Sequence, residues 1–474
     1  MNIMRKKSIS QMISESNKKA LSRSLGAFDL TLLGIGAIIG TGIFVLTGVA
    51  AAQHAGPSLI ISFIISAIAC GCAALCYAEF SSSVPIAGSV YTYTYATIGE
   101  IVAFLIGWDL MLEYLLAVSS VATGWSAYFQ SLLSGFGIHI PAVLSSAPGA
   151  GKGGIVDLPA IVIILIITAL LSKGIRESAK VNNIMVFIKL AVVILFIVAG
   201  VGYVKPDNWT PFMPFGFQGI MAGAATVFFA YIGFDAVSTA AEEVRKPQRD
   251  LPIGIISSLV ICTTLYIIVS LVLTGIVPFA KLNVSDPVAF ALHFVGQNTI
   301  AGLISVGAIT GITTVLLVML YGQVRISFAM SRDGLLPPVF SKVHPKFKTP
   351  FANTWLIGCI AAIISGIVDL NTLAELVNIG TLSAFTLVAI AVIILRKTHP
   401  NLKRAFKVPF VPVLPIITVF ICGYLMISLS KVTWISFVIW IAIGFIVYFF
   451  YGRKHSKLND EKKSRVSSLP FFIP

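Results

Sequence analysis

Long apolar stretches recur along almost the whole chain, and most charged residues fall between them. A helix needs roughly 20 predominantly apolar residues to cross the hydrocarbon core of a bilayer. Twelve stretches of about this size can be recognised, so the pattern predicts an all-α integral membrane protein with twelve transmembrane helices. The predicted spans are 28–50, 57–80, 98–131, 157–174, 179–204, 217–244, 251–277, 297–330, 352–368, 372–395, 410–430 and 433–451.

Glycine interrupts the first span. Residues 34–48, GIGAIIGTGIFVLTG, hold five glycines, although each costs a helix interior about 1 kcal/mol relative to alanine. The sixth span has a matching weak point at Gly233 and Asp235, in ATVFFAYIGFDAVSTAAEE. Interrupted helices at matching places in two halves of a chain indicate an inverted repeat. The predicted parts are an N-terminal segment 1–27, two inverted five-helix repeats at 28–204 and 217–395, two accessory helices at 410–451 and a tail 452–474.

The two interruptions predict a binding site. An unwound segment inside lipid persists only where it faces protein or a cavity. Unwinding at residues 40–42 would free N–H groups at the start of a half-helix, which suit a carboxylate, and unwinding at 229–234 would free carbonyl groups, which suit an ammonium. Together they predict a clamp for the zwitterion of an α-amino acid. The alternative is that the glycines, with Gly36 and Gly40 four residues apart, only let helices approach closely.

Four motifs carry a family resemblance: LGIGAIIGTGIFVLTG, AEFSSSVPIAGSVYTYTYATIGE, FFAYIGFDAVSTAAEEVRKPQRDLP and MSRDGLLP. From Leu21 to His455 the chain resembles the amino acid-polyamine-organocation (APC) superfamily of transporters, in particular its bacterial cationic amino acid transporter branch. The resemblance implies a leucine-transporter-type fold with discontinuous helices 1 and 6, and amino acid uptake driven by a proton gradient, without sodium or another cofactor. It implies a substrate site in which the carboxylate meets the amides of Thr41 and Gly42, next to Gly40, and the amino group meets the carbonyls of Ile38, Phe229, Ala230 and Ile232.

The net charge of +14 lies mainly on one side of the predicted membrane. With the N-terminus in the cytoplasm, 28 of the 33 Lys and Arg residues fall inside, Lys189 falls within a span, and four fall outside. These four are Lys152, Lys205, Lys281 and Lys431. This positive-inside pattern predicts a multi-pass protein of the cell membrane with both termini in the cytoplasm. The basic side then faces anionic lipid, so we expect membrane lipids and an amino acid as partners and no nucleic acid. A small membrane subunit is left open.

Lys189 lies in the middle of the fifth span, in VNNIMVFIKLAVVILF. A lysine at the bilayer centre costs about 2.5–3.5 kcal/mol, and the inner surface is too far for its side chain to reach easily. By the resemblance, this lysine stands where sodium-coupled relatives bind a second sodium ion, and its ammonium is expected to tie span 1 carbonyls to Thr313 or Thr314 of span 8. The hypothesis is that Lys189 couples proton movement to transport.

Three further residues within the spans are candidates. Glu113 on span 3, with Asp109 one turn earlier, could carry a proton, meet a cationic substrate side chain or be a structural acid. Asp235 is expected to cap the second half of span 6. Met319 on span 8 is expected to border the substrate side chain and to favour small neutral amino acids such as alanine over arginine; the alternative is that it only packs.

Other classes of protein fit the sequence less well. The six cysteines all fall in apolar spans, where packing is their usual role, and we expect no metal site. We find no spaced His/Asp/Glu cluster or nucleophile motif of an enzyme, and two offset broken helices suit alternating access better than a channel. The stretches 242–252 and 325–337 could form an inner gate or be solvated loops. We therefore predict a secondary active, proton-coupled amino acid symporter and not an enzyme, with amino acid exchange and arginine or lysine uptake as alternatives.

Overall fold

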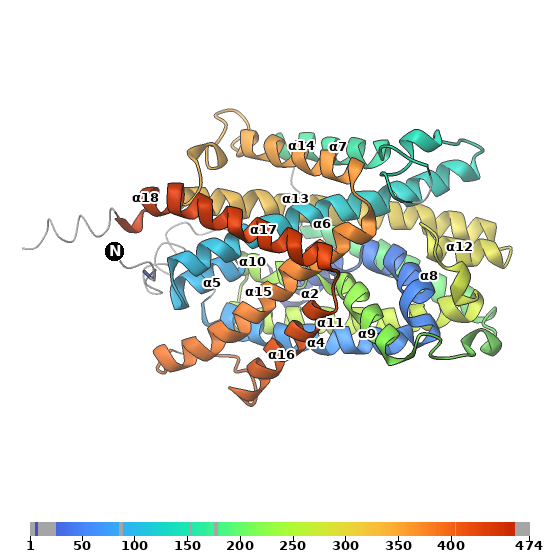
Figure 1. The fold of residues 1–474 in the computed structure, drawn as a ribbon, viewed down its shortest axis with the longest axis horizontal. Coiled ribbons are helices and arrows are strands. Elements are labelled where there is room, and N and C mark those ends of the chain that lie inside the picture. The colour runs from blue at the N-terminus through green and yellow to red at the C-terminus, as the bar shows by residue number, and fades with distance from the viewer. Residues whose placement is uncertain are drawn as a thin grey trace, which may run out of the picture.

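A computed structural model describes residues 5–7, 25–84, 89–150, 153–174, 179–402 and 404–459 of the 474-residue chain. The described residues are mostly helical and form no β-strand beyond two isolated bridges, which confirms the all-α class. The predicted N-terminal segment 1–27 and tail 452–474 lie largely outside these residues, as does Lys152. The α-helices are α2 (Ala27–Ile38), α3 (Thr47–Ala50), α4 (Leu59–Ser83), α5 (Ser89–Thr97), α6 (Glu100–Gly135), α7 (Leu158–Ser172), α8 (Ala179–Val201), α9 (Gly216–Val227), α10 (Ala236–Thr239), α11 (Pro247–Ile276), α12 (Pro287–Phe294), α13 (Asn298–Arg332), α14 (Phe351–Ile367), α15 (Leu370–Thr398), α16 (Val413–Ile427), α17 (Lys431–Val447) and α18 (Arg453–His455) (Figure 1).

Helix is present in all twelve predicted stretches. Eight helical segments are long and apolar enough to cross a membrane: Gly42–Ser83, Glu100–Gly135, Asn182–Val201, Gly216–Ser238, Pro247–Ile276, Asn298–Arg332, Leu370–Thr398 and Lys431–His455. Four shorter apolar helices, α2, α7, α14 and α16, occupy the remaining predicted positions. The segment Gly42–Ser83 contains the second half of predicted span 1 together with span 2, which is why α2 stands alone as a short helix.

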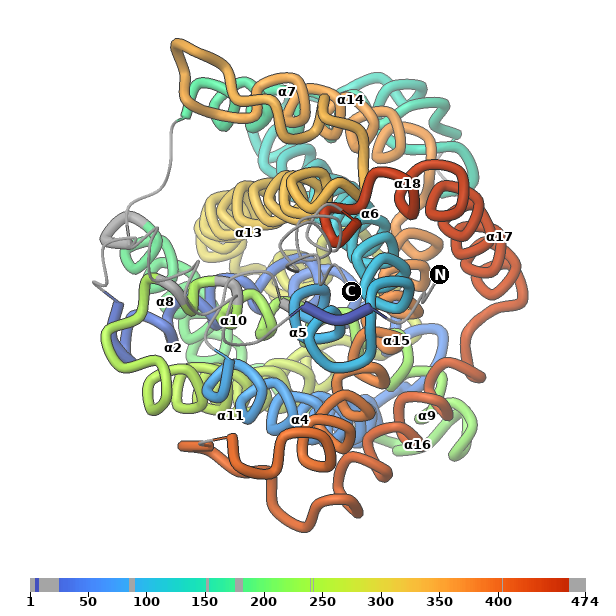
Figure 2. Tube along the Cα trace, turned by 90° about the vertical axis from the view of Figure 1, so that its left-hand side faces the viewer, coloured from blue at the N-terminus to red at the C-terminus, as the bar shows by residue number. Residues whose placement is uncertain are grey.

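Two long helices, α6 and α13, pack against each other through the middle of the molecule (Figures 1 and 2). The pair α7 and α14 lies on one side of them, and α4, α11 and α16 lie on the other (Figure 2). The short helix α2 packs against α8 and α11, and also contacts α13 and α10. The end of α2 at the first interruption is therefore buried among other helices.

Glycine lets α2 and α11 approach closely. A Cβ added at Gly34 would lie 2.4 Å from Ser258 Oγ, and one added at Gly254 would lie 2.6 Å from Leu30 Cβ. A Cβ added at Gly36 would lie 2.8 Å from Val186 Cγ2 of α8. Gly34 and Gly36 thus allow close helix approach, which is part of what the alternative interpretation of the glycine-rich stretch expects.

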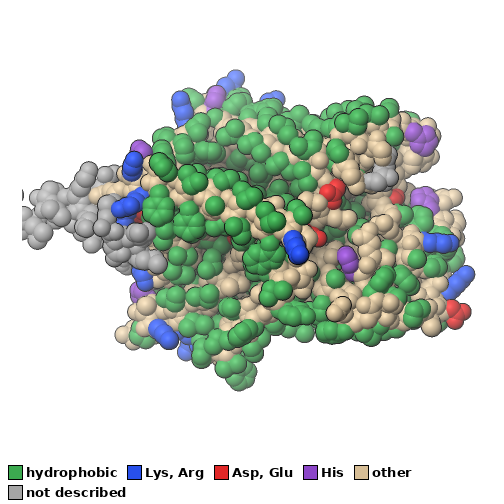
Figure 3. All heavy atoms as spheres, viewed as in Figure 1, with side chains coloured by type: hydrophobic (Ala, Val, Ile, Leu, Met, Phe, Trp, Pro, Cys, Tyr) green, Lys and Arg blue, Asp and Glu red, His purple; other side chains and the backbone are tan. Residues whose placement is uncertain are grey.

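The outer helices keep large apolar side chains exposed. Examples are Ile184 and Val198 on α8, Ile363 on α14, Phe420 on α16 and Ile435 on α17. On the face drawn in Figure 3, apolar side chains form a broad band, and most of the visible Lys and Arg side chains lie near its two ends. Apolar area of this extent needs a partner other than water, and a lipid bilayer supplies it.

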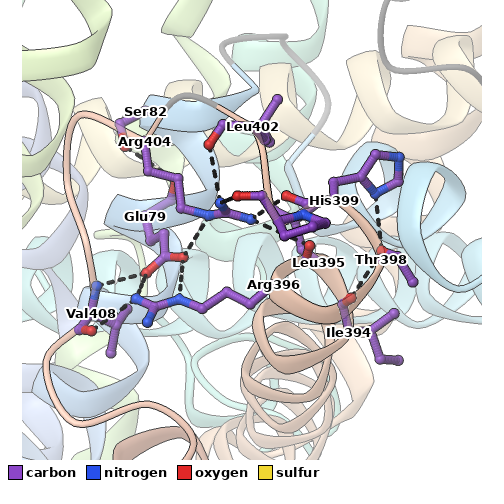
Figure 4. Close-up of polar contacts among 11 residues, drawn as sticks. Glu79, Ser82, Ile394, Leu395, Arg396, Thr398, His399, Leu402, Arg404 and Val408 are labelled. Atoms are coloured by element: carbon purple, nitrogen blue, oxygen red, sulfur yellow. Dashed lines mark hydrogen bonds and ion pairs between the residues drawn. The ribbon is translucent and has the colours of Figure 1, made fainter.

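A buried carboxylate anchors the connection between α15 and α16. Glu79, near the end of α4, is fully buried and accepts hydrogen bonds from Arg396 Nε at 2.9 Å and Arg396 Nη2 at 2.6 Å (Figure 4). It also accepts from the Val408 N–H at 2.6 Å, and Arg404 Nε lies 3.4 Å away. These contacts hold the loop after α15 against α4.

The described parts of both termini meet at one end of the molecule (Figure 1). Arg5 forms an ion pair with Glu100 of α6 at 2.8 Å, and Glu100 also accepts from Tyr448 at 3.0 Å. Lys7 pairs with Asp333 at 2.7 Å, so part of the stretch 325–337 is in contact with the N-terminal segment and is not simply solvated. An even number of membrane crossings requires both termini to lie at the same end of the molecule, as their described parts do here.

Candidate functional site

The first span is interrupted at Ile39 and Gly40. Helix α2 ends at Ile38, Ile39 is extended (φ −74°, ψ 102°), and helical geometry resumes at Thr41 (φ −54°, ψ −29°). The next residues form a π-helical turn, Gly42–Leu46 (η1), a feature frequent at functional sites. The break is confirmed, although it begins one residue before the predicted 40–42.

The main-chain amides after this break have the arrangement expected for anion binding. The first hydrogen bond of the second half-helix runs from the Phe44 N–H to the Gly40 carbonyl at 3.3 Å. The amides of Thr41, Gly42 and Ile43 precede it, and N-terminal amides of this kind lack a partner within the helix. The half-helix therefore presents the donor groups that the sequence predicted.

The sixth span is interrupted as well. Helix α9 ends at Val227, a 3-10 turn follows at Phe228–Tyr231, and Ile232 is extended (φ −63°, ψ 137°). Gly233 then has a φ of 116°, a conformation that favours glycine because it lacks a Cβ. The chain returns to helix at α10, so the second predicted break is also confirmed.

The two breaks touch each other. A Cβ added at Gly42 would lie 2.4 Å from Ala230 Cα and 3.0 Å from Ala230 N. A Cβ added at Gly233 would lie 2.8 Å from the carbonyl oxygen of Ala37. These distances leave no room for a side chain, so glycine at both positions is what allows contact. The residues after the first break thereby contact the turn before Gly233, and Gly233 contacts the end of α2.

Tyr266 of α11 bridges the carbonyl side of both breaks. Its hydroxyl lies 3.1 Å from the Ile38 carbonyl oxygen and 3.0 Å from that of Ala230. The Phe229 carbonyl accepts the Ile232 N–H at 3.2 Å. Sequence reasoning missed Tyr266, for which a tyrosine in the centre of the apolar run of span 7 was the available signal.

Helix α6 forms one wall beside the breaks. A Cβ added at Gly124 would lie 2.3 Å from Thr41 Cγ2, and the Thr41 hydroxyl donates to the Val121 carbonyl at 3.4 Å. One turn further, the Tyr128 hydroxyl donates to the Phe44 carbonyl at 2.8 Å. Thr41 and the half-helix after it are therefore held directly against α6.

Helix α13, which packs against α6, also lies beside the first break. Gly311 lies against Lys189, Val315 Cγ2 would lie 3.2 Å from a Cβ at Gly40, and Gly322 lies against Tyr114. Residues three or four apart share one face of a helix, so Met319 lies on this same face, between Val315 and Gly322. Met319 is buried, and its contact with a substrate remains a prediction.

Lys189 lies between α2 and α13. It is fully buried, and its Nζ donates to the Gly36 carbonyl at 2.6 Å. Gly36 belongs to the last turn of α2, where carbonyls lack helical partners and the helix dipole favours a cation. A Cβ added at Gly311 would lie 2.7 Å from Lys189 Cγ. The Thr314 hydroxyl donates to the Gly311 carbonyl at 2.8 Å, and the predicted tie from Lys189 to a threonine hydroxyl remains a prediction.

The acidic candidates lie together near α15. A Cβ added at Gly380 would lie 3.1 Å from Asp109 Oδ1 and 3.5 Å from Glu113 Cβ. Both acids are buried, and within the described part of the chain both Asp109 carboxyl oxygens and Glu113 Oε2 have no hydrogen-bond partner. Asp235 stands at the N-cap position of α10, but its side chain makes no capping hydrogen bond. The predicted cap is therefore wrong: Asp235 Oδ2 instead lies 3.4 Å from the Tyr114 hydroxyl of α6.

Two broken helices that meet inside a membrane-embedded helical bundle are characteristic of secondary transporters. The chain belongs to the amino acid permease family, whose model matches residues 25–457. This family lies within the APC superfamily, so the resemblance seen in the sequence is confirmed.

Relatives match the chain over nearly its full length. It is 65% identical over 458 residues to a methylthioribose transporter of Bacillus subtilis, covering 97% of this chain and 99% of that protein. It is 60% identical over 463 residues to the branched-chain amino acid permease BcaP of the same species, with 97% and 99% coverage. A vacuolar cationic amino acid transporter 4 of Arabidopsis thaliana is 33% identical over 581 residues, covering 97% of each chain. The protein is thus a multi-pass membrane transporter of this family and not an enzyme.

Proposed function

We propose that the protein takes up neutral L-amino acids by alternating access and couples this uptake to protons. The observation that carries the substrate assignment is the contact between Gly42 and Ala230. It places the start of a half-helix, whose amides favour a carboxylate, next to the turn Phe228–Tyr231, whose carbonyls favour an ammonium. A free α-amino acid carries both groups on one carbon atom and can span these two halves.

The walls of the site support an aliphatic substrate side chain. Met319 and Val315 on α13 are apolar and lie on the face that meets Gly40. Alanine fits the earlier expectation of a small neutral substrate, and the relative named as a branched-chain amino acid permease supports extension to leucine, isoleucine and valine. A cationic substrate is the alternative, with Glu113 as the partner of its side chain.

Lys189 supports the proposed proton coupling. Its ammonium fastens the last turn of α2 to α8, and its stem lies against Gly311 of α13. Loss of the proton would remove the positive charge opposite the α2 carbonyls and weaken this attachment, which would let α2 move relative to α13. Glu113 is the second proposed proton-binding group, because it is buried and one of its oxygens lacks a described partner. With an ammonium at this place, we expect transport without sodium.

The proposed topology has twelve crossings, with two inverted repeats and both termini in the cytoplasm. Helix in all twelve predicted stretches and described terminal segments at the same end support it, as do matching breaks in the first and sixth spans. Cysteines introduced singly at Lys205 and Lys246 test it with a membrane-impermeant thiol reagent on intact cells. We expect labelling at position 205 alone. Labelling at position 246 instead would show that the protein has the opposite orientation in the membrane.

Methylthioribose is a second candidate substrate, because a relative with 65% identity is named for its transport. This sugar carries neither a carboxylate nor an ammonium. It would have to bind through its hydroxyl groups to the same main-chain amides and carbonyls.

Uptake into proteoliposomes distinguishes symport from exchange and an amino acid substrate from methylthioribose. Vesicles containing the purified protein are given labelled alanine, leucine, arginine or methylthioribose, with or without an inward proton gradient and with or without unlabelled amino acid inside. We expect alanine and leucine to enter empty vesicles when the gradient is present, without sodium. Uptake only into preloaded vesicles would indicate exchange, uptake of the sugar alone would establish the second candidate, and a sodium requirement would refute the role of Lys189.

A further inference from the structure

One tyrosine hydroxyl already occupies the carbonyl side of the proposed clamp. Tyr266 Oη lies within 3.1 Å of the Ile38 and Ala230 carbonyl oxygens, one from each broken helix. Both carbonyls and the tyrosine are buried. These are two of the four carbonyls expected to receive a substrate ammonium.

We infer that Tyr266 determines which head group the site accepts: it lets a ligand with a hydroxyl bind where an α-amino acid presents its ammonium. The chemical class that follows is the 2-hydroxy acid, which keeps the carboxylate and side chain of an amino acid. This inference rests on the proposed clamp, because it assigns a role to the carbonyl half of that site.

The numbers of hydrogen-bond donors explain the inference. An ammonium has three donors and a ligand hydroxyl has one, whereas a tyrosine hydroxyl can donate and accept. A buried carbonyl that loses its partner is costly. With Tyr266 present, its single hydroxyl hydrogen serves one of the Ile38 and Ala230 carbonyls, so a ligand hydroxyl has to supply a donor only to the other. Without the tyrosine hydroxyl, an ammonium can still supply the missing donors, but a hydroxyl cannot.

The ring of Tyr266 is held firmly enough for its hydroxyl to have this effect. It packs edge-on against Tyr231 and tilted against Phe63, with both pairs of ring centroids 5.5 Å apart. Tyr231 provides a matched control, because its buried hydroxyl lies 3.0 Å from the Phe63 carbonyl of α4, which is outside the clamp. Tyr266→Phe and Tyr231→Phe each remove one buried hydroxyl without changing the ring.

The test is competition against labelled leucine uptake in proteoliposomes. The competitors are two matched pairs: L-alanine with L-lactate, and L-leucine with L-2-hydroxy-4-methylpentanoate. For the wild type we expect each hydroxy acid to inhibit within about 100-fold of its amino acid, the loss expected from one charge-assisted hydrogen bond. In Tyr266→Phe this ratio of inhibition constants should rise by a further factor of about 10, whereas Tyr231→Phe should keep the wild-type ratio.

Two results would overturn the inference. One is a ratio in Tyr266→Phe that is unchanged or lower, and the other is a wild-type protein that hydroxy acids do not inhibit at any concentration. The second result needs no variant, so the inference remains testable if Tyr266→Phe fails to fold. Failure of the proposed function looks different, because then neither leucine uptake nor inhibition by alanine is observed in the wild type.

Discussion

Replacing Gly42 with alanine tests whether the two broken helices must touch. The new Cβ would lie 2.4 Å from Ala230 Cα, whereas ordinary van der Waals contact begins at about 3.4 Å. The Ala230 Cα and the Gly42 Cα that carries the new Cβ are both main-chain atoms, so no side-chain rotation relieves the overlap. One half-helix has to move by about 1 Å, and a misplacement of this size in a positioned site can cost about 100-fold in rate.

The assay is the initial rate of labelled leucine and alanine uptake in proteoliposomes, normalised to the amount of folded protein. We expect Gly42→Ala to lower this rate about 100-fold. Gly302→Ala is the matched control, since Gly302 is also in a helix but a Cβ there has nothing within 4 Å. Gly302→Ala should transport like the wild type. Wild-type rates in Gly42→Ala would refute the reasoning, because contact between the breaks would then be dispensable.

Three further substitutions test other parts of the account. Lys189→Ala should abolish the stimulation of uptake by an inward proton gradient, and intact proton-driven uptake would contradict the coupling role. Met319→Ser should let larger amino acids compete with labelled alanine; an unchanged competition profile would assign Met319 to packing alone. Glu79→Gln leaves Arg396 and Arg404 without their buried charge partner and should destabilise the protein by roughly 3–5 kcal/mol, seen as a lower melting temperature; an unchanged melting temperature would exclude this anchoring role.

The breaks were predictable because their cause is local. A glycine weakens a helix whatever surrounds it. Glycine is also the residue that readily adopts a φ of 116°, as Gly233 does. The burial of Lys189 could likewise be inferred, since only the apolar residues on both sides of it were needed. The contact that the first break makes was less predictable, because Gly42 meets Ala230, 188 positions later in the chain.

Partners supplied by other helices were beyond the reach of the sequence. The position of Tyr266 in span 7 was visible, but its two carbonyl partners belong to α2 and to the turn after α9. For the same reason Asp235 was assigned to a cap, while its carboxylate in fact meets Tyr114 of α6. Such contacts follow from how helices distant in the chain are arranged, and hydropathy patterns do not encode that arrangement.

The most direct test of the central claim is an experimentally determined structure with leucine bound. The account predicts the leucine carboxylate within about 3 Å of the Thr41 and Gly42 amide nitrogens, with its ammonium facing the carbonyls of Ile38, Phe229, Ala230 and Ile232. Leucine bound away from both breaks, or bound while the first and sixth spans form uninterrupted helices, would contradict it.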